Sequence, residues 1–427
     1  MMKKTILAVL ATMMFCGAAF AGEKTVLRMS WWGGAERHEV TLEAIKAFEK
    51  ANPDVEVKAE YMGWDGYLKR LTTQIGAGSE ADVMQIDWAW LAMFSKDGNG
   101  FYDINKLKND IDLTEFDQQW LDSGSVQGKL NALPVSFTTI VLLWNETTWG
   151  KTGIAYPKTW DELFAAGKMF KEKLGPKYYP LEGNWLDLVY LTHAYIFQKT
   201  GKQYLDPDKP EVALSKEELM DWLAGYKKLY DSGAIIGLQE RVSIGGDSER
   251  PSQEFKEFID GEWAGTSAFD SAITYRLGSL PPDQKFVLGD FLMEPNAASS
   301  GRIGRPSMLF AIGKNSKNPV KAGKLIEFLL ASEEGTKILK ATRGAFLTKT
   351  GYKTLVDLDL IPPLNQAAIE QIRNTACHTP NPYLEHARTK DLLRTVFDSV
   401  GYGKMSLEEG AEQLQREGNR IVKRLAR

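Results

Sequence analysis

The chain has 427 residues, of which 43% are hydrophobic and 25% charged, a composition typical of a globular protein large enough for two domains. Its net charge is −4 and no segment is a block of basic residues, which argues against nucleic acid as a partner.

The amino-terminal segment Met1–Ala21 has the features of a cleaved export signal. Lys3 and Lys4 form its positive start, Thr5–Phe15 its short apolar core, and Ala19–Ala21 its small-x-small cleavage site. The apolar core is too short to cross a bilayer as a helix, and no later segment is long and apolar enough. We therefore expect a soluble exported protein. Loss of the two lysines would leave a net charge of −6, and the one remaining cysteine, Cys377, would have no partner for an intramolecular disulfide.

The mature chain begins with an apolar run, Val26–Gly34, that predicts a β-strand ended by two glycines. Trp31, Trp32 and Gly33 lie at the expected carboxyl end of this strand, and ligands of open α/β sheets bind beyond such ends. Indole rings can stack on the C–H faces of sugar rings while their N–H groups donate hydrogen bonds. The alternative for either tryptophan is a place in the core.

The segments that follow alternate between helical and strand patterns. Thr41–Lys50 and Tyr67–Ile75 have helical spacing, whereas Val55–Tyr61 alternates and Ala81–Ile86 is a buried apolar run. This β-α-β-α-β order predicts a parallel sheet covered by helices.

Polar and aromatic residues again follow the strand Ala81–Ile86. Asp87 can accept hydrogen bonds from sugar hydroxyls, or it can cap the next helix, and Trp88 or Trp90 can offer a stacking face. Leu130–Trp144 then contains a proline-marked extended segment between two apolar strands, which predicts a crossing between domains. We count Ser136 and Phe137 of this segment among the candidate ligand-binding residues.

The middle of the chain is rich in helices and aromatic residues. Most of these aromatics are expected in the core, but Trp185, preceded by Gly183-Asn184, is expected on the rim of a cleft. Three helix starts carry a capping box: Thr159 with Glu162, Ser215 with Glu218, and Ser406 with Glu409.

Four further candidates lie toward the carboxyl end of the chain. Phe258–Asp270 reads as a helix end, a glycine and a strand of small residues that allows close approach of a ligand, with Asp270 at its end. Arg302 and Arg305 precede a strand, and Arg343 follows a helix. Their guanidinium groups can bind a carboxylate through two hydrogen bonds, or they can bind carbonyls and surface carboxylates of the protein itself.

We find no motif that carries catalysis. The four histidines lack metal-ligand spacing, and no nucleophile elbow, phosphate-binding loop or zinc-protease motif is present. We therefore expect no catalytic residue, metal or cofactor, and a binding protein rather than an enzyme.

Seven short motifs in a fixed order carry a resemblance to a known family. They are Trp31–Gly34; Phe48–Pro53 with Val55–Val57; Ala81–Val83; Trp144–Glu146; Pro157–Leu163; Phe258–Gly261; and Asn318-Pro319. In these motifs the chain resembles the periplasmic extracellular solute-binding proteins that deliver carbohydrates to ABC importers, the maltose-binding-protein type. Pro157–Leu163 is the most specific of them.

The resemblance implies an α/β fold of two lobes, each a mostly parallel sheet flanked by helices, with the ligand cleft between them. One lobe would hold residues 22–133 plus 265–342, and the other 134–264 plus 343–427. The three candidate arginines would face the cleft. The family also implies a monomer in the periplasm that closes on an oligosaccharide and presents it to a membrane permease.

Stacking faces combined with cationic groups predict an acidic sugar. As a whole the chain is most similar to the oligogalacturonide-binding members of the family, which capture pectin fragments. A receptor for neutral oligosaccharides or for glycerol phosphate is the alternative. An exported pectin-degrading enzyme is less favoured, because a β-helix lyase would contain many stacked short strands and little helix.

Overall fold

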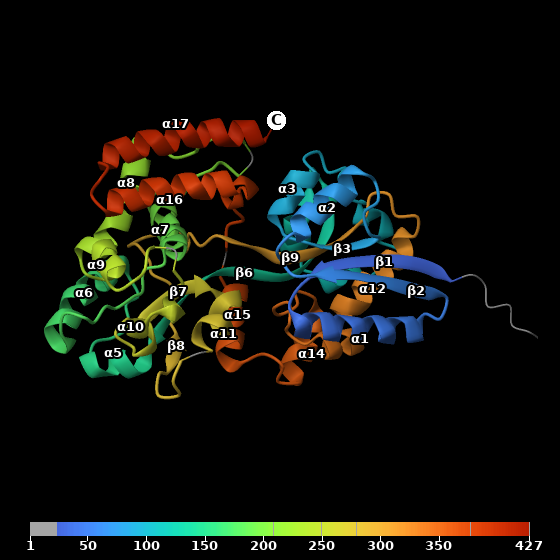
Figure 1. The fold of residues 1–427 in the computed structure, drawn as a ribbon, viewed down its shortest axis with the longest axis horizontal. Helices are drawn as coiled ribbons and strands as arrows, with labels where there is room; N and C mark the ends of the chain where they lie inside the picture. Colours follow the sequence, from blue (N-terminus) through green and yellow to red (C-terminus); the bar gives the residue numbers. More distant parts are fainter. Residues whose placement is uncertain (1–23, 208, 249, 279, 376, 427) are drawn as a thin grey trace, which may run out of the picture.

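The computed structural model describes residues 24–426 apart from 208, 249, 279 and 376, so the predicted signal peptide lies outside the described residues. Figure 1 shows two lobes side by side, joined across the middle by two long strands, β6 (Ala132–Asn145) and β9 (Gly304–Ile312). We call the lobe that contains the first strand the first lobe and the other the second lobe.

The first lobe is built on the predicted parallel strands. β1 (Thr25–Trp32) pairs in parallel with both β2 (Val55–Met62) and β3 (Val83–Ile86), so the predicted β-α-β-α-β order is confirmed. The two connections are the helices α1 (Ala35–Ala51) and α2 (Tyr67–Gly76). All three strands end at the same edge of the sheet, which faces the second lobe (Figure 1).

The strand β6 belongs to both lobes. Its residues 132–139 pair antiparallel with β9, which also pairs with β3, whereas residues 140–145 pair with strands of the second lobe. We predicted two strands separated by an extended crossing, but the segment is one continuous strand. The register shifts between Pro134 and Ser136 and again between Ser136 and Phe137, so the irregularity that the proline indicated is a bulge within the strand.

Helices cover both lobes. Those of the first lobe also include α3 (Ala89–Phe94), α4 (Gln118–Ser123), α12 (Pro319–Ala331), α13 (Glu333–Leu339) and α14 (Lys349–Asp357). The second lobe holds α5 (Glu146–Thr152), α6 (Trp160–Leu174), α7 (Trp185–Thr200), α8 (Lys216–Asp231), α9 (Leu238–Ser243), α10 (Lys256–Ile259), α11 (Ile273–Leu277), α15 (Pro363–Arg373), α16 (Ala387–Gly401) and α17 (Leu407–Leu425). The other strands are the β4 (Ser125–Val126) and β5 (Lys129–Leu130) hairpin, β7 (Gly265–Phe269) and β8 (Phe286–Leu288). The three predicted capping boxes are confirmed, and they open α6, α8 and α17.

Core packing divides the chain differently from the lobe boundaries that we expected. β7 and β8 pair with β6, and Phe291 and Ile303 lie in the apolar core of the second lobe. Residues 265–303 therefore belong to the second lobe and not to the first. Phe346 and Leu355 lie in the core of the first lobe. The expected boundaries at 264/265 and 342/343 are therefore corrected, because strand pairing and core contacts hold both segments on the other side.

Within the described residues, no helix combines the length and the apolar content needed to cross a membrane.

Candidate functional site

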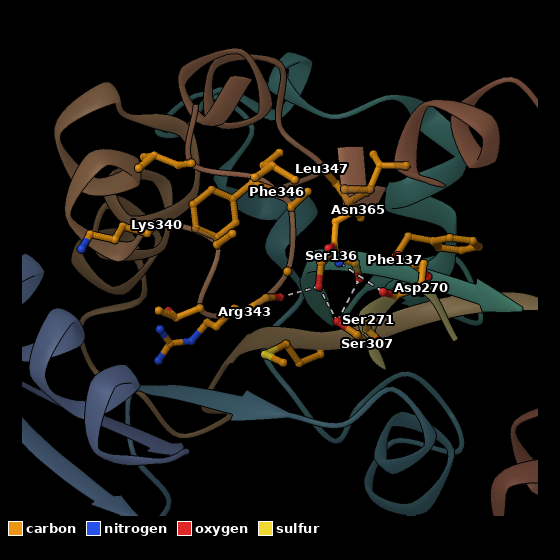
Figure 2. A pocket seen from close by; sticks show the side chains of 18 of the residues that line it. Ser136, Phe137, Asp270, Ser271, Ser307, Lys340, Arg343, Phe346, Leu347 and Asn365 are labelled. Atoms are coloured by element: carbon orange, nitrogen blue, oxygen red, sulfur yellow. Dashed lines mark hydrogen bonds between the residues drawn. The ribbon is translucent and has the colours of Figure 1, made fainter. Parts of the chain in front are cut away.

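A cavity of about 490 Å³ lies where the two lobes meet, beside the bulge of β6, and we call it the hinge cavity. Its walls come from the start of α1, the bulge itself, β9, the turn Asp270–Ala272, the 340–347 loop and α15. Figure 2 shows Lys340 and Arg343 on one side of this cavity and Asp270 on the other. The hinge cavity therefore draws its lining from segments that lie far apart in the sequence.

Four of the predicted ligand-binding residues line the hinge cavity: Ser136, Phe137, Asp270 and Arg343. Ser136 lies at the bulge, where its hydroxyl donates to the backbone oxygen of Arg343 at 2.6 Å and contacts the hydroxyl of Ser307 (Figure 2). Gly344 packs against it so closely that an added Cβ would lie 2.8 Å from Ser136 Oγ. The hinge strand and the 340–347 loop are thus fixed to each other at the floor of the cavity.

Asp270 presents a buried carboxyl group to the cavity. Its Oδ1 accepts hydrogen bonds from the Thr138 hydroxyl at 2.8 Å and from the backbone N–H of Thr139 at 2.9 Å. Burial raises the pKa of Asp270 to about 6, although these hydrogen bonds favour its ionised form. Together with the hydroxyls of Ser271 and Ser307, this carboxyl group provides acceptors and donors suited to sugar hydroxyls.

Cationic side chains outnumber carboxyl groups around the hinge cavity. The cations are Arg37, Lys340, Arg343 and Arg373, and the carboxyl groups are Glu36 and Asp270. Of the four cations only Arg343 was predicted. Arg37 follows the Gly33-Gly34 turn, which is a signal that the sequence contained, whereas nothing local distinguishes Lys340 or Arg373.

A group of aromatic rings gathers at the carboxyl ends of the parallel strands. Trp32, at the end of β1, contacts Trp64 and Trp90 with ring centroids 5.2 and 5.3 Å away, and Trp64 stacks on Trp90 at 5.5 Å. Trp32 and Trp90 are nearly buried, but Trp64 is 53% exposed. Trp64 therefore offers the open face of this group, although it was not among the predicted residues. It follows β2 between Gly63 and Gly66, so the strand-end signal that identified Trp32 after β1 was also present here.

Trp31 lies on the opposite side of the sheet, because successive side chains of a strand point to opposite faces. It is fully buried, stacks on Tyr61 at 5.0 Å and donates from Nε1 to His38 Nδ1 at 3.1 Å. No face of its ring is open, so the core alternative describes Trp31. Gly33 continues from β1 into the turn and donates its N–H to the backbone oxygen of Met62.

Three other predicted residues lie away from the hinge cavity. Trp88 donates to the backbone oxygen of Ser123 and lines a second cavity of about 570 Å³ between the lobes. Trp185, which we predicted on a cleft rim, begins α7 and packs in the core of the second lobe rather than in the lining of the hinge cavity. Arg302 is buried with its guanidinium over the ring of Phe291 and bonded to Gln371, which corrects its expected place facing the cleft.

Arg305 and Asp87 belong to a buried charge cluster near the contact between the lobes. Glu385 accepts hydrogen bonds from Arg305 at 3.0 Å, from the Tyr190 hydroxyl at 2.7 Å and from Lys390 at 2.7 Å. Although burial opposes ionisation, the charges of Arg305 and Lys390 lower the pKa of Glu385 to about 2. The guanidinium of Arg305 is thus already paired with a protein carboxylate.

Asp87 lies two residues before α3, whose N-cap is Trp88. Its carboxylate accepts from the backbone N–H of Ala89 at the start of α3. Burial raises the pKa of Asp87, and the charge of Arg305 opposes this effect.

Among the described residues, no group of three or more His, Cys, Asp or Glu side chains is arranged to hold a metal ion.

The fold is that of a two-lobed α/β protein with a cavity at the junction of the lobes. The family model for the bacterial extracellular solute-binding proteins matches residues 34–336, and the chain belongs to this family. A periplasmic oligogalacturonide-binding protein from Yersinia enterocolitica is 40% identical, with a TM-score of 0.87, over 94% of this chain and 100% of that one.

Two further relatives agree with this assignment. A periplasmic solute-binding protein from Pectobacterium atrosepticum is 42% identical over 94% of this chain and 100% of its own, with a TM-score of 0.85. The diacetylchitobiose-binding protein DasA of Streptomyces coelicolor is 27% identical over 95% of this chain and 91% of its own.

Proposed function

We propose that this protein is a periplasmic receptor that binds acidic oligogalacturonides, the fragments of pectin, and delivers them to the membrane permease of an ABC importer. The observation that carries the proposal is the excess of cationic side chains around the hinge cavity. Hydroxyl and carboxyl groups on its floor provide partners for ring hydroxyls, and the cations provide partners for uronate carboxylates. The similarity to the Yersinia protein supports the same ligand class.

We also propose that the receptor works by closure of two lobes about β6 and β9. Within the described residues, the first lobe then comprises 24–139 with 304–361, and the second 140–303 with 362–426. Pairing changes partner between residues 139 and 140 of β6, and Ile361 is the last buried member of the first core. A ligand that contacts both walls of the cavity stabilises the closed arrangement more than the open one. The protein acts as a monomer and does not cleave its ligand.

Isothermal titration calorimetry tests the ligand class. We expect the mature protein to bind digalacturonate with a Kd in the micromolar range, about −8 kcal/mol, and to bind maltose and glycerol 3-phosphate far more weakly. Tight binding of maltose or diacetylchitobiose without binding of digalacturonate would favour a receptor for neutral sugars. Shorter or unsaturated products after overnight incubation with oligogalacturonides would contradict the non-enzymatic assignment.

A further inference from the structure

The chain passes between the two lobes at three places, which we call the crossings. The first lies between residues 139 and 140 of β6, the second between residues 303 and 304 at the start of β9, and the third between residues 361 and 362 before α15. Closure of the lobes has to change the backbone at these crossings. Side chains that connect the crossings to each other therefore affect how the lobes can move.

The side chain of Asp270 takes the place of a strand at the first crossing. β7 pairs with β6 up to Phe269, which lies opposite Ile140. The same register would put residue 270 opposite Thr139, but the chain turns away there. Instead, the carboxylate of Asp270 accepts the backbone N–H of Thr139 at 2.9 Å and the hydroxyl of Thr138 at 2.8 Å. A side chain thus satisfies the donor that the strand would otherwise have paired.

The other two crossings are connected to the same place. Thr139 donates from its hydroxyl to the backbone oxygen of Ile303 at 2.6 Å, so the first crossing is bonded to the second. Asn365, in the first turn of α15, accepts from the Thr274 hydroxyl at 3.2 Å and donates to the backbone oxygen of Asp270 at 3.5 Å. We call the residues that connect the crossings the hinge node: Thr138, Thr139, Asp270 and Asn365.

The hinge node also borders the hinge cavity. Asp270 and Asn365 line it (Figure 2). Thr138 and Thr139 are buried, and neither is among the described residues that line the cavity. A ligand in the hinge cavity therefore lies against residues whose other contacts hold the crossings.

An acceptor on a side chain suits a strand that has to bend. A backbone ladder fixes donor and acceptor together, whereas rotation about the side-chain bonds of Asp270 lets its carboxylate follow a change of angle. If the carboxylate is removed, water in the vacated space can bond to the Thr139 N–H while the cavity is open. Closure on a ligand excludes this water, and a buried donor without a partner is unfavourable. Loss of the carboxylate therefore disfavours the closed arrangement more than the open one.

We propose that Asp270 is a positioning residue that holds the first crossing in the closed arrangement and thereby connects occupation of the hinge cavity to closure of the lobes. This inference rests on the proposed function, which includes closure about β6 and β9. The role needs an acceptor oxygen rather than a negative charge, because both donors are neutral. Asp270→Asn keeps an oxygen that accepts the same two hydrogen bonds, whereas Asp270→Ala has none.

The affinity of the intact mature protein for digalacturonate, measured by isothermal titration calorimetry, tests this role. We expect Asp270→Ala to bind about tenfold more weakly than wild type, about 1.4 kcal/mol, and Asp270→Asn to bind within about threefold of wild type. The loss should appear as faster dissociation in stopped-flow tryptophan fluorescence, because the closed arrangement is the one destabilised. An equal loss of affinity in both variants would contradict the role of the acceptor oxygen.

Thr138→Val separates the hinge node from direct contact with a ligand, because Thr138 does not line the cavity. It removes the hydroxyl that bonds to Asp270 and Ser271, and we expect it to weaken digalacturonate binding by about threefold. Thr152→Val is the matched control. It removes a buried hydroxyl of α5 that donates to the backbone oxygen of Trp149 at 2.6 Å, away from the hinge cavity. We expect it to lower stability and to leave the affinity unchanged.

Small-angle X-ray scattering tests the same role without a ligand. Because the closed arrangement is disfavoured, Asp270→Ala and Thr138→Val should have a larger radius of gyration than wild type, whereas Thr152→Val should match wild type. Unchanged affinity and an unchanged radius of gyration in both hinge-node variants would overturn this inference and leave the proposed function intact. Failure of wild type to bind digalacturonate would overturn the proposed function, and the radii of gyration would then decide for or against the hinge node.

Discussion

Replacement of Glu385 by Gln tests the buried charge cluster quantitatively. The carboxylate is 6% exposed and accepts from Arg305, Lys390 and Tyr190. Its pKa falls from an ordinary 4.5 to about 2, so its ionised form is favoured by folding. At 1.36 kcal/mol per pH unit, the ionised group stabilises the fold by about 3 kcal/mol at pH 7. We expect Glu385→Gln to lower the free energy of unfolding at pH 7 by about this amount.

The pH dependence gives the sign of the effect. A carboxyl group with a lowered pKa stabilises the protein above its unfolded value of 4.5, and this contribution is lost as the pH falls through 4.5 toward 2. The difference in the free energy of unfolding between wild type and Glu385→Gln should therefore decrease from about 3 kcal/mol at pH 7 to about 1 kcal/mol at pH 3.

Urea unfolding, followed by tryptophan fluorescence at both pH values, measures this difference. Glu412→Gln is the control, because Glu412 pairs with Lys216 at 2.7 Å but is 52% exposed, and such pairs contribute less than about 1 kcal/mol. A difference for Glu385→Gln that equals the control, or that stays constant between pH 7 and pH 3, would refute the reasoning.

Three further predictions concern the hinge cavity and its surroundings. Trp64→Ala should weaken oligogalacturonide binding by about 1 kcal/mol, because it removes the open ring of the aromatic group, and unchanged calorimetric affinity would exclude that group from the site. Ionisation of the buried Asp270 carboxyl group lowers the free energy of unfolding by about 3 kcal/mol, because its raised pKa makes the folded form bind a proton more tightly than the unfolded form. Asp270→Asn should remove this destabilisation, which grows as the pH rises from about 4 to 6. Parallel curves of stability against pH for variant and wild type would contradict this. Gly344→Ala should destabilise the protein by about 1 to 2 kcal/mol and weaken binding, because φ is +84° and the new Cβ would meet Ser136; an unchanged melting temperature would count against the close fit.

Local patterns in the sequence predict much of this fold. Alternation along Val55–Tyr61 and the apolar run at Ala81–Ile86 identified the parallel strands, and the Thr159–Glu162 spacing identified a helix start. These features depend on neighbours within a few residues, so the local sequence is enough to predict them. The lobe boundaries do not have this property, because they depend on which distant strand β7 joins and which core receives α14.

The candidate site shows the same division. Ser136 could be chosen because it lies in a proline-marked extended segment, and Asp270 because it ends a predicted strand, but the environment of an arginine depends on residues far away in sequence. Arg305 is paired with Glu385, 80 residues later, whereas Arg343 meets Gln85, 258 residues earlier. Nothing near either arginine distinguishes them. Strand alternation, however, already required that Trp31 and Trp32 face opposite sides, and only one of them could join the aromatic group.

The bulge of β6 has a consequence for how such a protein can change. Ser136 and Phe137 lie within a few residues of the point where the strand passes from one lobe to the other, and the same two residues line the hinge cavity. A substitution there would alter the angle between the lobes and the shape of the hinge cavity at once. In the receptor that we propose, selectivity for a new sugar would therefore be acquired more easily through the 340–347 loop or α15, whose side chains can vary without bending the strand that connects the lobes.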